Sequence, residues 1–292
     1  MGLCDIQEIR AILGRHGFHF SKSLGQNFLT AAWVPEQIAA SCGVDETSCA
    51  LEVGPGMGCL TVELSKRAER VAAIELDRAL FPVLEETLAD CSNVKVVHGD
   101  VLKTNLAAVC KEQFGEKPVY ACANLPYYIT TPAITALLES GAFRAVTVMV
   151  QKEVAERICS EPGTSDYSAF SIYVQYHAKA ELLFEVPADC FVPQPKVDSA
   201  VIRLTPLAAP AVETADEKLF FAIVRAAFNQ RRKTLSNAAV AAFNGQLDKN
   251  EIAGLLESCG LDPKVRGERL SLQEYADLTN AAVKLLQTKK DS

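Results

Sequence analysis

Residues 49–61, with the sequence CALEVGPGMGCLT, join a short apolar run to a glycine-rich turn. An apolar run, a glycine turn and an amphipathic stretch in this order are typical of the first βα unit of a parallel sheet. Glycine permits the tight turn, and the start of the following helix offers free N–H groups to a ligand. Gly54, Gly56 and Gly58 do not fit the G-x-G-x-x-G pattern, because its third glycine would fall at Cys59. The stretch therefore predicts a ligand-binding turn that differs from the dinucleotide fingerprint.

From residue 49 onward the chain alternates short apolar runs with amphipathic stretches, as parallel sheets with crossover helices do. We expect strands at 49–53, 70–76, 94–98, 120–124, 145–151, 171–186 and 199–204, and helices at 60–67, 79–89 and 133–140. No helical pattern separates the last two strands, so they should form an antiparallel hairpin at one sheet edge. The pattern predicts a doubly wound α/β domain over residues 1–205.

A second, smaller domain is expected over residues 206–292. Residues 205–210, TPLAAP, resemble a linker, and helical periodicity replaces the β-runs beyond them. Two capping boxes, Thr214-x-x-Glu217 and Ser271-x-x-Glu274, predict helix starts. This part has 12 Lys and Arg against 11 Asp and Glu, and residues 218–247 hold five bases and no acid. We expect an all-α domain whose basic segment meets a polyanion.

The overall composition excludes several classes of protein. A net charge of −7 over 292 residues argues against a wholly basic protein that coats nucleic acid. The ten cysteines include no C-x-x-C pair, so neither a zinc motif nor a redox motif is predicted. The first residues lack the apolar segment of a signal peptide, and no apolar run reaches the ~18 residues of a membrane span. We expect a cytoplasmic protein with reduced cysteines and no bound metal.

Carboxylates follow two of the expected strands. Glu75 lies 21 residues after Gly54 at a strand end, where a carboxylate can accept hydrogen bonds from two ribose hydroxyls. Asp100 follows the next strand and can bind an adenine amino group, although it could also be a plain helix cap. No positive side chain is placed for a pyrophosphate. The turn and the two carboxylates therefore favour S-adenosyl-L-methionine over NAD.

The fourth expected strand ends in Asn124-Leu125-Pro126-Tyr127. The Asn124 side-chain oxygen and the Leu125 carbonyl could accept both hydrogens of an exocyclic amine, and Tyr127 could stack on the attached base. Asn and Pro are also turn formers, so a purely structural turn is the alternative. Because the segment follows a strand that ends beside the glycine turn, we expect a catalytic site there.

Seven segments together resemble one enzyme family. They are KSLGQNFL at 22–29, EVGPGMG at 52–58, Glu75-x-Asp77, Gly99-Asp100, NLPY at 124–127, FVPQPKVDSA at 191–200 and RAAFNQRRKTLS at 225–236. The chain resembles the rRNA adenine N6-dimethyltransferases, and in particular their small-subunit branch. This resemblance implies a Rossmann-like class I methyltransferase domain, with a mostly parallel seven-stranded sheet and an antiparallel edge hairpin, followed by a small helical RNA-binding domain.

The resemblance also implies roles for individual residues. Asn27 and Leu29 would close over the methionine end of the cofactor, and Gly54 would contact it through its backbone. Glu75 would hold the ribose, Asp100 the adenine, and Asn124 would bridge the cofactor and the target amine. Phe191 would face Tyr127 across the target adenine, although an isolated Phe is more typical of a core.

The basic segment supplies the candidate RNA-binding residues Arg225, Arg231, Arg232 and Lys233. Bases that follow an apolar helix could face RNA phosphates and position the substrate without reading its sequence. The alternative is a solvated turn, or ion pairs with acids of the first domain.

The resemblance implies a reaction: methyl transfer from S-adenosyl-L-methionine to N6 of two adjacent adenosines. These lie in a hairpin loop near the 3′ end of small-subunit (16S) rRNA, in a pre-30S particle, and we expect the enzyme to be a monomer. Such a transfer depends on placement and orientation, so no catalytic histidine is required. Three alternatives stay open: an NAD-dependent oxidoreductase, an assembly factor that only binds RNA, and the branch that methylates large-subunit rRNA.

Overall fold

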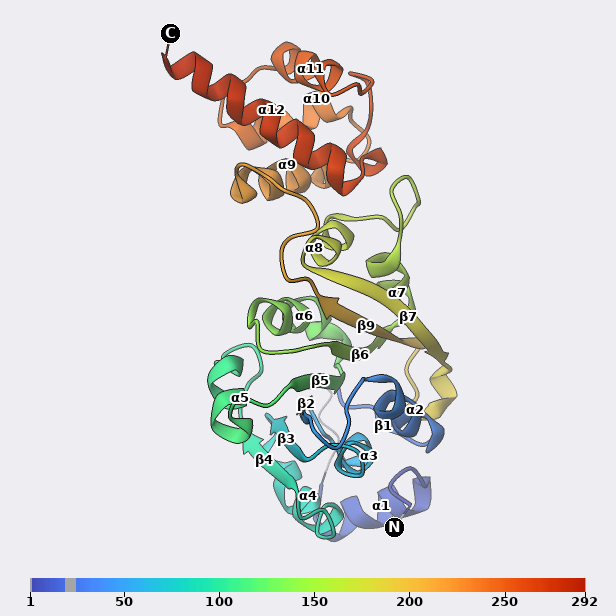
Figure 1. Cartoon of the computed structure of the whole chain (residues 1–292). Helices are drawn as coiled ribbons and strands as arrows, with labels where there is room; N and C mark the ends of the chain where they lie inside the picture. The colour runs from blue at the N-terminus through green and yellow to red at the C-terminus, as the bar shows by residue number, and fades with distance from the viewer. Residues whose placement is uncertain (1, 19–24, 292) are drawn as a thin grey trace. The chain divides into compact units, whose positions relative to one another are not determined.

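The computed structural model describes residues 2–18 and 25–291. They divide into two compact units, and the chain passes between the units three times (Figure 1). The first unit comprises Met1–Ala155 and Ala180–Pro206, and the second comprises Glu156–Lys179 and Leu207–Ser292. The predicted division differs from this one, because it placed residues 156–179 in the first domain.

A seven-stranded sheet forms the centre of the first unit, in the order β4-β3-β2-β5-β6-β9-β7. The strands are β2 (Cys49–Val53), β3 (Arg70–Glu75), β4 (Val94–His98), β5 (Val119–Asn124), β6 (Val146–Gln151), β7 (Ala178–Val186) and β9 (Ser199–Pro206). Strands β2 to β6 pair in parallel, whereas β9 is antiparallel to β6. The mixed sheet with β9 and β7 as neighbours at one edge agrees with the predicted fold class. All five residues of β2 are buried, which explains its unbroken apolar run.

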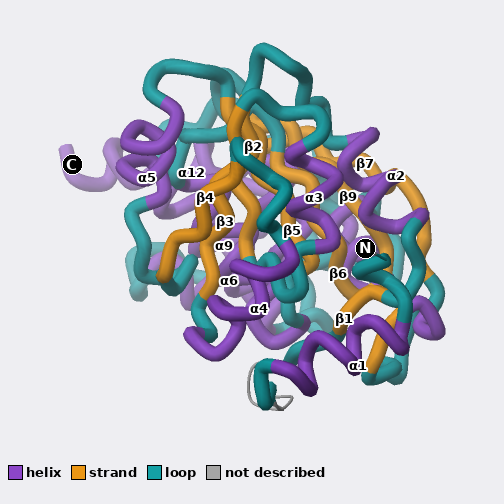
Figure 2. The backbone as a smooth tube through the Cα atoms, turned by 90° about the horizontal axis from the view of Figure 1, so that it is seen from below, coloured by secondary structure: helices purple, strands orange, loops and turns teal. Residues whose placement is uncertain are grey.

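Helices cover both faces of this sheet (Figures 1 and 2). Helices α2 (Trp33–Ser41) and α3 (Cys59–Ser65) lie on one face, and α5 (Leu106–Phe114) and α6 (Thr130–Glu139) lie on the other. Helices α1 (Ile6–Arg15) and α4 (Phe81–Thr87) share a further apolar cluster with Phe28 and Met57. The first unit is therefore the doubly wound domain that the sequence predicts.

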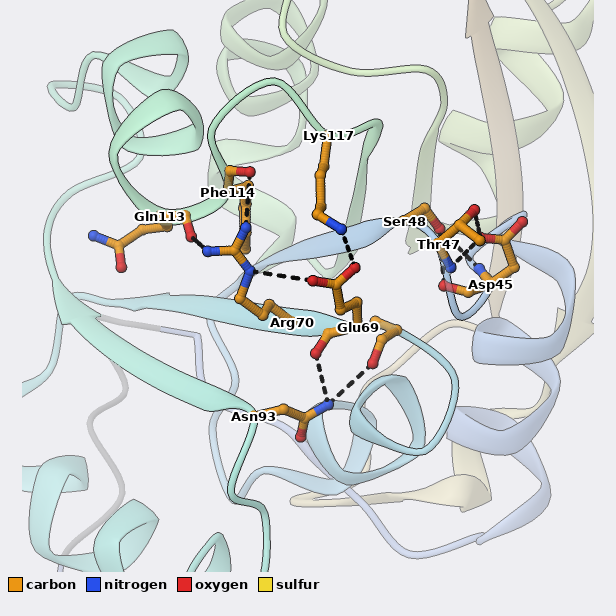
Figure 3. Close-up of polar contacts among 10 residues, drawn as sticks. Asp45, Thr47, Ser48, Glu69, Arg70, Asn93, Gln113, Phe114 and Lys117 are labelled. Atoms are coloured by element: carbon orange, nitrogen blue, oxygen red, sulfur yellow. Dashed lines mark hydrogen bonds and ion pairs between the residues drawn. The ribbon is translucent and has the colours of Figure 1, made fainter.

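The edge of the sheet where β2 and β3 begin is closed by polar contacts (Figure 3). Arg70, the first residue of β3, donates to the carbonyl oxygens of Gln113 at 2.5 Å and Phe114 at 2.8 Å. Glu69 beside it pairs with Lys117. These contacts tie the amino ends of the strands to the segment that follows α5, whereas ligands of such sheets bind at the opposite, carboxyl edge.

The second unit is helical and has its own core. Its helices are α8 (Ala169–His177), α9 (Glu217–Asn229), α10 (Leu235–Ala238), α11 (Lys249–Ser258) and α12 (Leu272–Asp291), and α7 (Lys152–Cys159) leads into it. The predicted strand at 171–186 is wrong in its first half, because residues 169–177 form α8 and only Ala178–Val186 is a strand. Ile172 and Tyr176 recur at helical spacing, and both pack with Phe220 in this core. Tertiary packing therefore overrides the β-propensity of this segment.

The two predicted capping boxes had different outcomes. At Ser271 the box forms, since the Glu274 carboxylate accepts from the Ser271 N–H at 2.7 Å and the Ser271 hydroxyl accepts from the Glu274 N–H at 3.3 Å. At Thr214 it does not form, and that prediction is wrong. Helix α9 begins later, with Asp216 as its cap accepting from the Leu219 N–H at 2.9 Å.

The ten cysteines are all free thiols, six of them buried. Among residues 2–18 and 25–291, no three His, Cys, Asp or Glu side chains are grouped so that they could hold a metal ion. In the same residues, no helix combines the length and the apolar character that a membrane crossing needs.

Candidate functional site

One cavity of about 240 Å³ lies at the carboxyl ends of the parallel strands in the first unit. All the residues predicted to bind the cofactor or the target base line it: Asn27, Leu29, Gly54, Glu75, Asp100, Asn124, Leu125, Tyr127 and Phe191. The convergence follows from topology, because parallel strands end at the same sheet edge. What each residue does there stays a prediction.

The glycine turn forms one wall of the cavity. Gly54 has φ of 68°, and a Cβ built there would meet no atom within 4 Å. Gly58 has φ of 85°, and a Cβ there would lie 2.9 Å from Leu88 Cδ2. The turn thus needs glycine at Gly58 for packing and at both positions for backbone conformation. Open space beside Gly54 leaves room for a ligand to reach the backbone.

Glu75 at the end of β3 is 6% exposed. Its carboxylate accepts from the Asp77 N–H at 2.7 Å and from the Gly56 N–H at 3.4 Å. Burial raises the pKa of Glu75, and these backbone N–H groups partly oppose the rise. The carboxylate is therefore held rigidly against the glycine turn, with lone pairs left for ligand hydroxyls.

Asp100 follows β4 and performs part of the capping role that was its alternative. One carboxylate oxygen accepts from the Leu102 N–H at 3.0 Å, and the other lies 3.5 Å from Lys103 Nζ. Asp100 nevertheless lines the cavity. Its turn contacts fix the side chain and do not exclude an adenine amino group as a further donor.

Asn124 ends β5, and its amide contacts the N-terminal segment. The Asn124 Nδ2 atom donates to the Asn27 carbonyl oxygen at 3.4 Å. This orientation leaves Oδ1 as the acceptor for a ligand amine. The next residue, Leu125, is 1% exposed, and its N–H donates to the Met149 carbonyl at 3.2 Å. Strand pairing therefore fixes the backbone on which the two predicted acceptors lie.

Tyr127 is positioned by a hydrogen bond of 2.9 Å between its hydroxyl and Ser199 Oγ at the start of β9. Phe191 belongs to β8 (Phe191–Val192), which pairs antiparallel with β1 (Phe28–Leu29), so Phe191 lies opposite Leu29. Phe191 is 4% exposed and part of the core, as its alternative interpretation holds, yet it also lines the cavity. The rings of both Tyr127 and Phe191 thus line the cavity.

Glu52 is a cavity residue to which sequence reasoning assigned no role. It is 1% exposed, and its Oε2 atom has no hydrogen-bond partner among the described residues. Burial raises the pKa of Glu52 to about 8; the nearby Thr61 hydroxyl partly opposes this rise, and the Glu75 carboxylate adds to it. A buried acceptor without a partner is costly, which suits a cationic ligand group as its missing partner. The signal in the sequence is an acid inside an otherwise apolar strand.

The predicted RNA-binding residues of the second unit fall into two groups. Arg231 is already held within the second unit, since its Nε donates to Glu268 Oε2 and its Nη2 to the Ser165 carbonyl, each at 3.0 Å, and its contact with RNA stays a prediction. Its partner Glu268 lies in the second unit itself. Arg225, Arg232 and Lys233 are exposed, and within the described part of the chain they form no ion pair.

The segment KSLGQNFL at 22–29 is only partly covered. Lys22, Ser23 and Leu24 lie outside the described residues. The described part, from Gly25 onward, brings Asn27 and Leu29 to the cavity.

Comparison with known proteins agrees with this geometry. A family model described as ribosomal RNA adenine dimethylase matches residues 17–280. "Ribosomal RNA small subunit methyltransferase A" of Geobacillus thermodenitrificans is 47% identical over 95% of this chain and 96% of its own length. The protein of the same name from Clostridium perfringens is 48% identical over 97% and 99%.

Solved structures show the same fold. A dimethyladenosine transferase from Plasmodium falciparum is 27% identical with a TM-score of 0.70, covering 90% of this chain and 97% of its own. The 23S rRNA methyltransferase ErmE is 25% identical with a TM-score of 0.67, covering 87% and 98%. Because the family model and the relatives span nearly the whole chain, this chain belongs to the ribosomal RNA adenine dimethylase family.

Proposed function

We propose that this protein transfers methyl groups from S-adenosyl-L-methionine to N6 of adenosines in 16S rRNA of the small ribosomal subunit. The observation that carries the proposal is that Asn124 and Tyr127 share one cavity with Glu75 and Asp100. Relatives named for the small subunit are 47–48% identical, whereas the 23S enzyme is 25% identical. We further propose two adjacent adenosines near the 3′ end as target, a pre-30S particle as substrate, and a cytoplasmic monomer as enzyme.

The cavity residues fit S-adenosyl-L-methionine, which when bound supplies a methyl group on a positively charged sulfur. Open space beside Gly54 accommodates a ligand against the backbone, and the unpartnered Glu52 oxygen suits a positive charge. Glu75 would accept from the ribose hydroxyls and Asp100 from the adenine amine. Asn27 and Leu29 would cover the methionine end.

Asn124, Leu125, Tyr127 and Phe191 would position the target base. The Asn124 Oδ1 atom and the Leu125 carbonyl would accept the two amine hydrogens, which directs the nitrogen lone pair away from both acceptors. Tyr127, fixed by Ser199, and Phe191 would hold the ring between them. The amine of adenine is neutral and need not lose a proton before it reacts. Orientation is therefore the main contribution that these residues can make.

Mass spectrometry of both rRNAs from cells that lack this protein tests the proposal. We expect N6,N6-dimethyladenosine to disappear from 16S rRNA and to return with a plasmid-borne copy. Loss confined to 23S rRNA, or no loss at all, would contradict the proposed function.

Cofactor affinity should depend on pH through Glu52. Its pKa of about 8 leaves the carboxyl largely neutral near pH 7. A cationic ligand favours the ionised carboxylate. At a pH below that pKa, binding must therefore release the proton of the Glu52 carboxyl. Affinity should therefore rise from about pH 6 to about pH 7.5, by no more than about tenfold per pH unit. Calorimetry near pH 7, in buffers that differ in ionisation enthalpy, should show release of up to about one proton.

Glu52→Gln is the control for this effect. The α-amino group of the cofactor titrates near pH ~8 with either protein, so the difference between the two proteins isolates Glu52. Equal proton release by wild type and a folded Glu52→Gln would show that Glu52 does not face the charge.

We also propose that Arg225, Arg232 and Lys233 contact RNA phosphates. Replacing all three by Gln should weaken RNA binding and reduce the slope of log K against log salt by roughly 0.7–0.9 for each lost contact. Fluorescence titrations over a range of salt concentrations measure this slope. The charge-matched control replaces the exposed Lys95, Lys111 and Arg144 of the first unit.

Cofactor affinity and Tm should stay unchanged in both triple variants. If the slope is the same as in wild type, the phosphates are held elsewhere. The remaining candidates are Arg231, the group Lys264, Arg266 and Arg269, or the group Arg10, Arg15 and Lys22, the last of which lies outside the described residues.

A further inference from the structure

Tyr128 is the most exposed large hydrophobic side chain in the described part of the chain, at 58%. It follows Tyr127 directly and lines the same cavity. Tyr127 is half-buried and its hydroxyl is bonded to Ser199, whereas the Tyr128 side chain is exposed although it lines the same cavity. The cavity is thus lined by an inner ring, the half-buried Tyr127, and an outer ring, the exposed Tyr128.

The backbone of Tyr128 belongs to regular structure. Residues Tyr127–Ile129 form a short 3₁₀ helix in which the Ile129 N–H donates to the Pro126 carbonyl at 3.1 Å. Helix α6 begins immediately after it. The backbone that carries the ring is therefore fixed by hydrogen bonds of regular structure.

One side of the Tyr128 ring is supported by Gly25. A Cβ on Gly25 would lie 3.3 Å from Tyr128 Cδ1 and 3.5 Å from Cε1, so glycine lets the ring lie against the backbone. Gly25 also has φ of 59°, a conformation that favours glycine.

The exposed part of the ring has no internal partner. Trp33, another exposed aromatic, packs against Phe184 with ring centroids 6.0 Å apart. Among the described residues, Tyr128 has neither an aromatic partner nor a hydrogen bond from its hydroxyl. Neither core packing nor a hydrogen bond of the hydroxyl therefore accounts for an aromatic ring at this position.

A base that enters the cavity must leave its stack, which costs a few kcal/mol and deprives the neighbouring base of one stacking partner. A flat ring at the cavity mouth can replace that partner, because every base has a π-face that stacks on aromatic side chains. Tyr127 is assigned to the target base inside the cavity. The outer ring is therefore available to the next base along the strand.

We propose that Tyr128 is a stacking platform for the nucleobase adjacent to the target adenine in the RNA strand. This inference rests on the proposed function, since it assumes that an adenine of an RNA strand enters the cavity. It adds a residue outside the cofactor and amine sites that acts on RNA affinity and on the choice of target.

The first test replaces the ring. Tyr128→Ala should raise the KM for RNA by about 10- to 100-fold, the effect of losing one base–aromatic stack, with kcat within about twofold. Tyr128→Phe keeps the ring and should behave as wild type. Trp33→Ala removes an exposed aromatic away from the cavity and should leave the KM unchanged. Cofactor affinity, measured by calorimetry, should be the same in all four proteins.

The second test removes the base instead of the ring. Equilibrium RNA binding is measured without cofactor, with RNAs that carry an abasic site immediately 5′ or immediately 3′ of the target adenosine. For one of the two abasic RNAs, the loss of affinity for the wild-type protein should equal the loss that Tyr128→Ala causes with intact RNA. Combining the two changes should then add little further loss.

The stacking assignment is wrong if, for both the 5′ and the 3′ abasic RNA, the combined loss of affinity equals the product of the two separate losses. It is also wrong if Tyr128→Ala leaves the Kd for intact RNA unchanged. The binding cycle needs no methyl transfer, so it separates this inference from the proposed function. If the rRNA of cells lacking the protein keeps its dimethyladenosine, the proposed function fails, whatever the cycle shows. If the rRNA loses its dimethyladenosine but the cycle shows no coupling, only the role of Tyr128 is wrong.

Discussion

Asn124→Ala should reduce the single-turnover rate of methyl transfer by at least about 100-fold, while cofactor affinity changes by no more than a few-fold. The Asn124 Nδ2 atom donates to the Asn27 carbonyl, which leaves Oδ1 as an acceptor on a residue that lines the cavity. Its contact with the amine matters most as the amine reaches its reactive geometry, and loss of such a contact lowers the rate more than binding. Rapid-quench kinetics with saturating RNA and cofactor measure this rate.

Asn105→Ala is the matched control for this variant. Asn105 caps α5, accepting from the Ala108 N–H at 3.0 Å, and its loss should cost about 1 kcal/mol of stability without slowing the transfer. A single-turnover rate for Asn124→Ala within a few-fold of wild type would rule out the amine-positioning role.

Glu75→Ala should weaken cofactor binding by about 10- to 150-fold, because two ribose hydroxyls lose a charged acceptor worth roughly 1.5–3 kcal/mol. Isothermal titration calorimetry measures the Kd. RNA affinity should hardly change, since Glu75 is almost fully buried beneath the glycine turn.

The glycine turn itself depends on Glu75, so the variant must be shown to be folded. Glu75→Gln keeps the shape and one acceptor oxygen and should lose less affinity than Glu75→Ala. Glu63→Ala, which removes an acid that pairs with Lys66 and does not line the cavity, should leave the Kd unchanged. An unchanged Kd in a folded Glu75→Ala would refute the ribose assignment.

Much of the site could be predicted because several of its residues directly follow strands that are recognisable in the sequence. Glu75, Asp100 and Asn124 each follow an apolar run, and parallel strands bring their ends to one edge. Strand periodicity and chain order were therefore enough to bring these residues to one cavity. The doubly wound α/β domain followed from the same alternation of elements, whereas the seven-stranded sheet was what the family resemblance implied.

What the sequence did not reveal depends on distant contacts. Helix α8 contains residues that favour strands, and it is helical because its buried face packs against residues more than 40 positions further along, such as Phe220. The free cations of the basic segment could not be separated from Arg231 until Glu268, 37 residues away, was placed beside it. Glu52 was unremarked because the missing partner of its oxygen is visible only once its surroundings are known.

The three passages of the chain between the two units constrain how this protein can be recombined with its relatives. Tyr167, Ile172 and Tyr176 belong to the core of the helical unit, although they are encoded between β6 and β7 of the catalytic unit. A crossover at residue 206 alone would join these three side chains to helices of another parent, and the mismatch would open cavities. Residues 156–179 and 207–292 must therefore be inherited together, so a chimera with a different RNA preference needs three junctions rather than one.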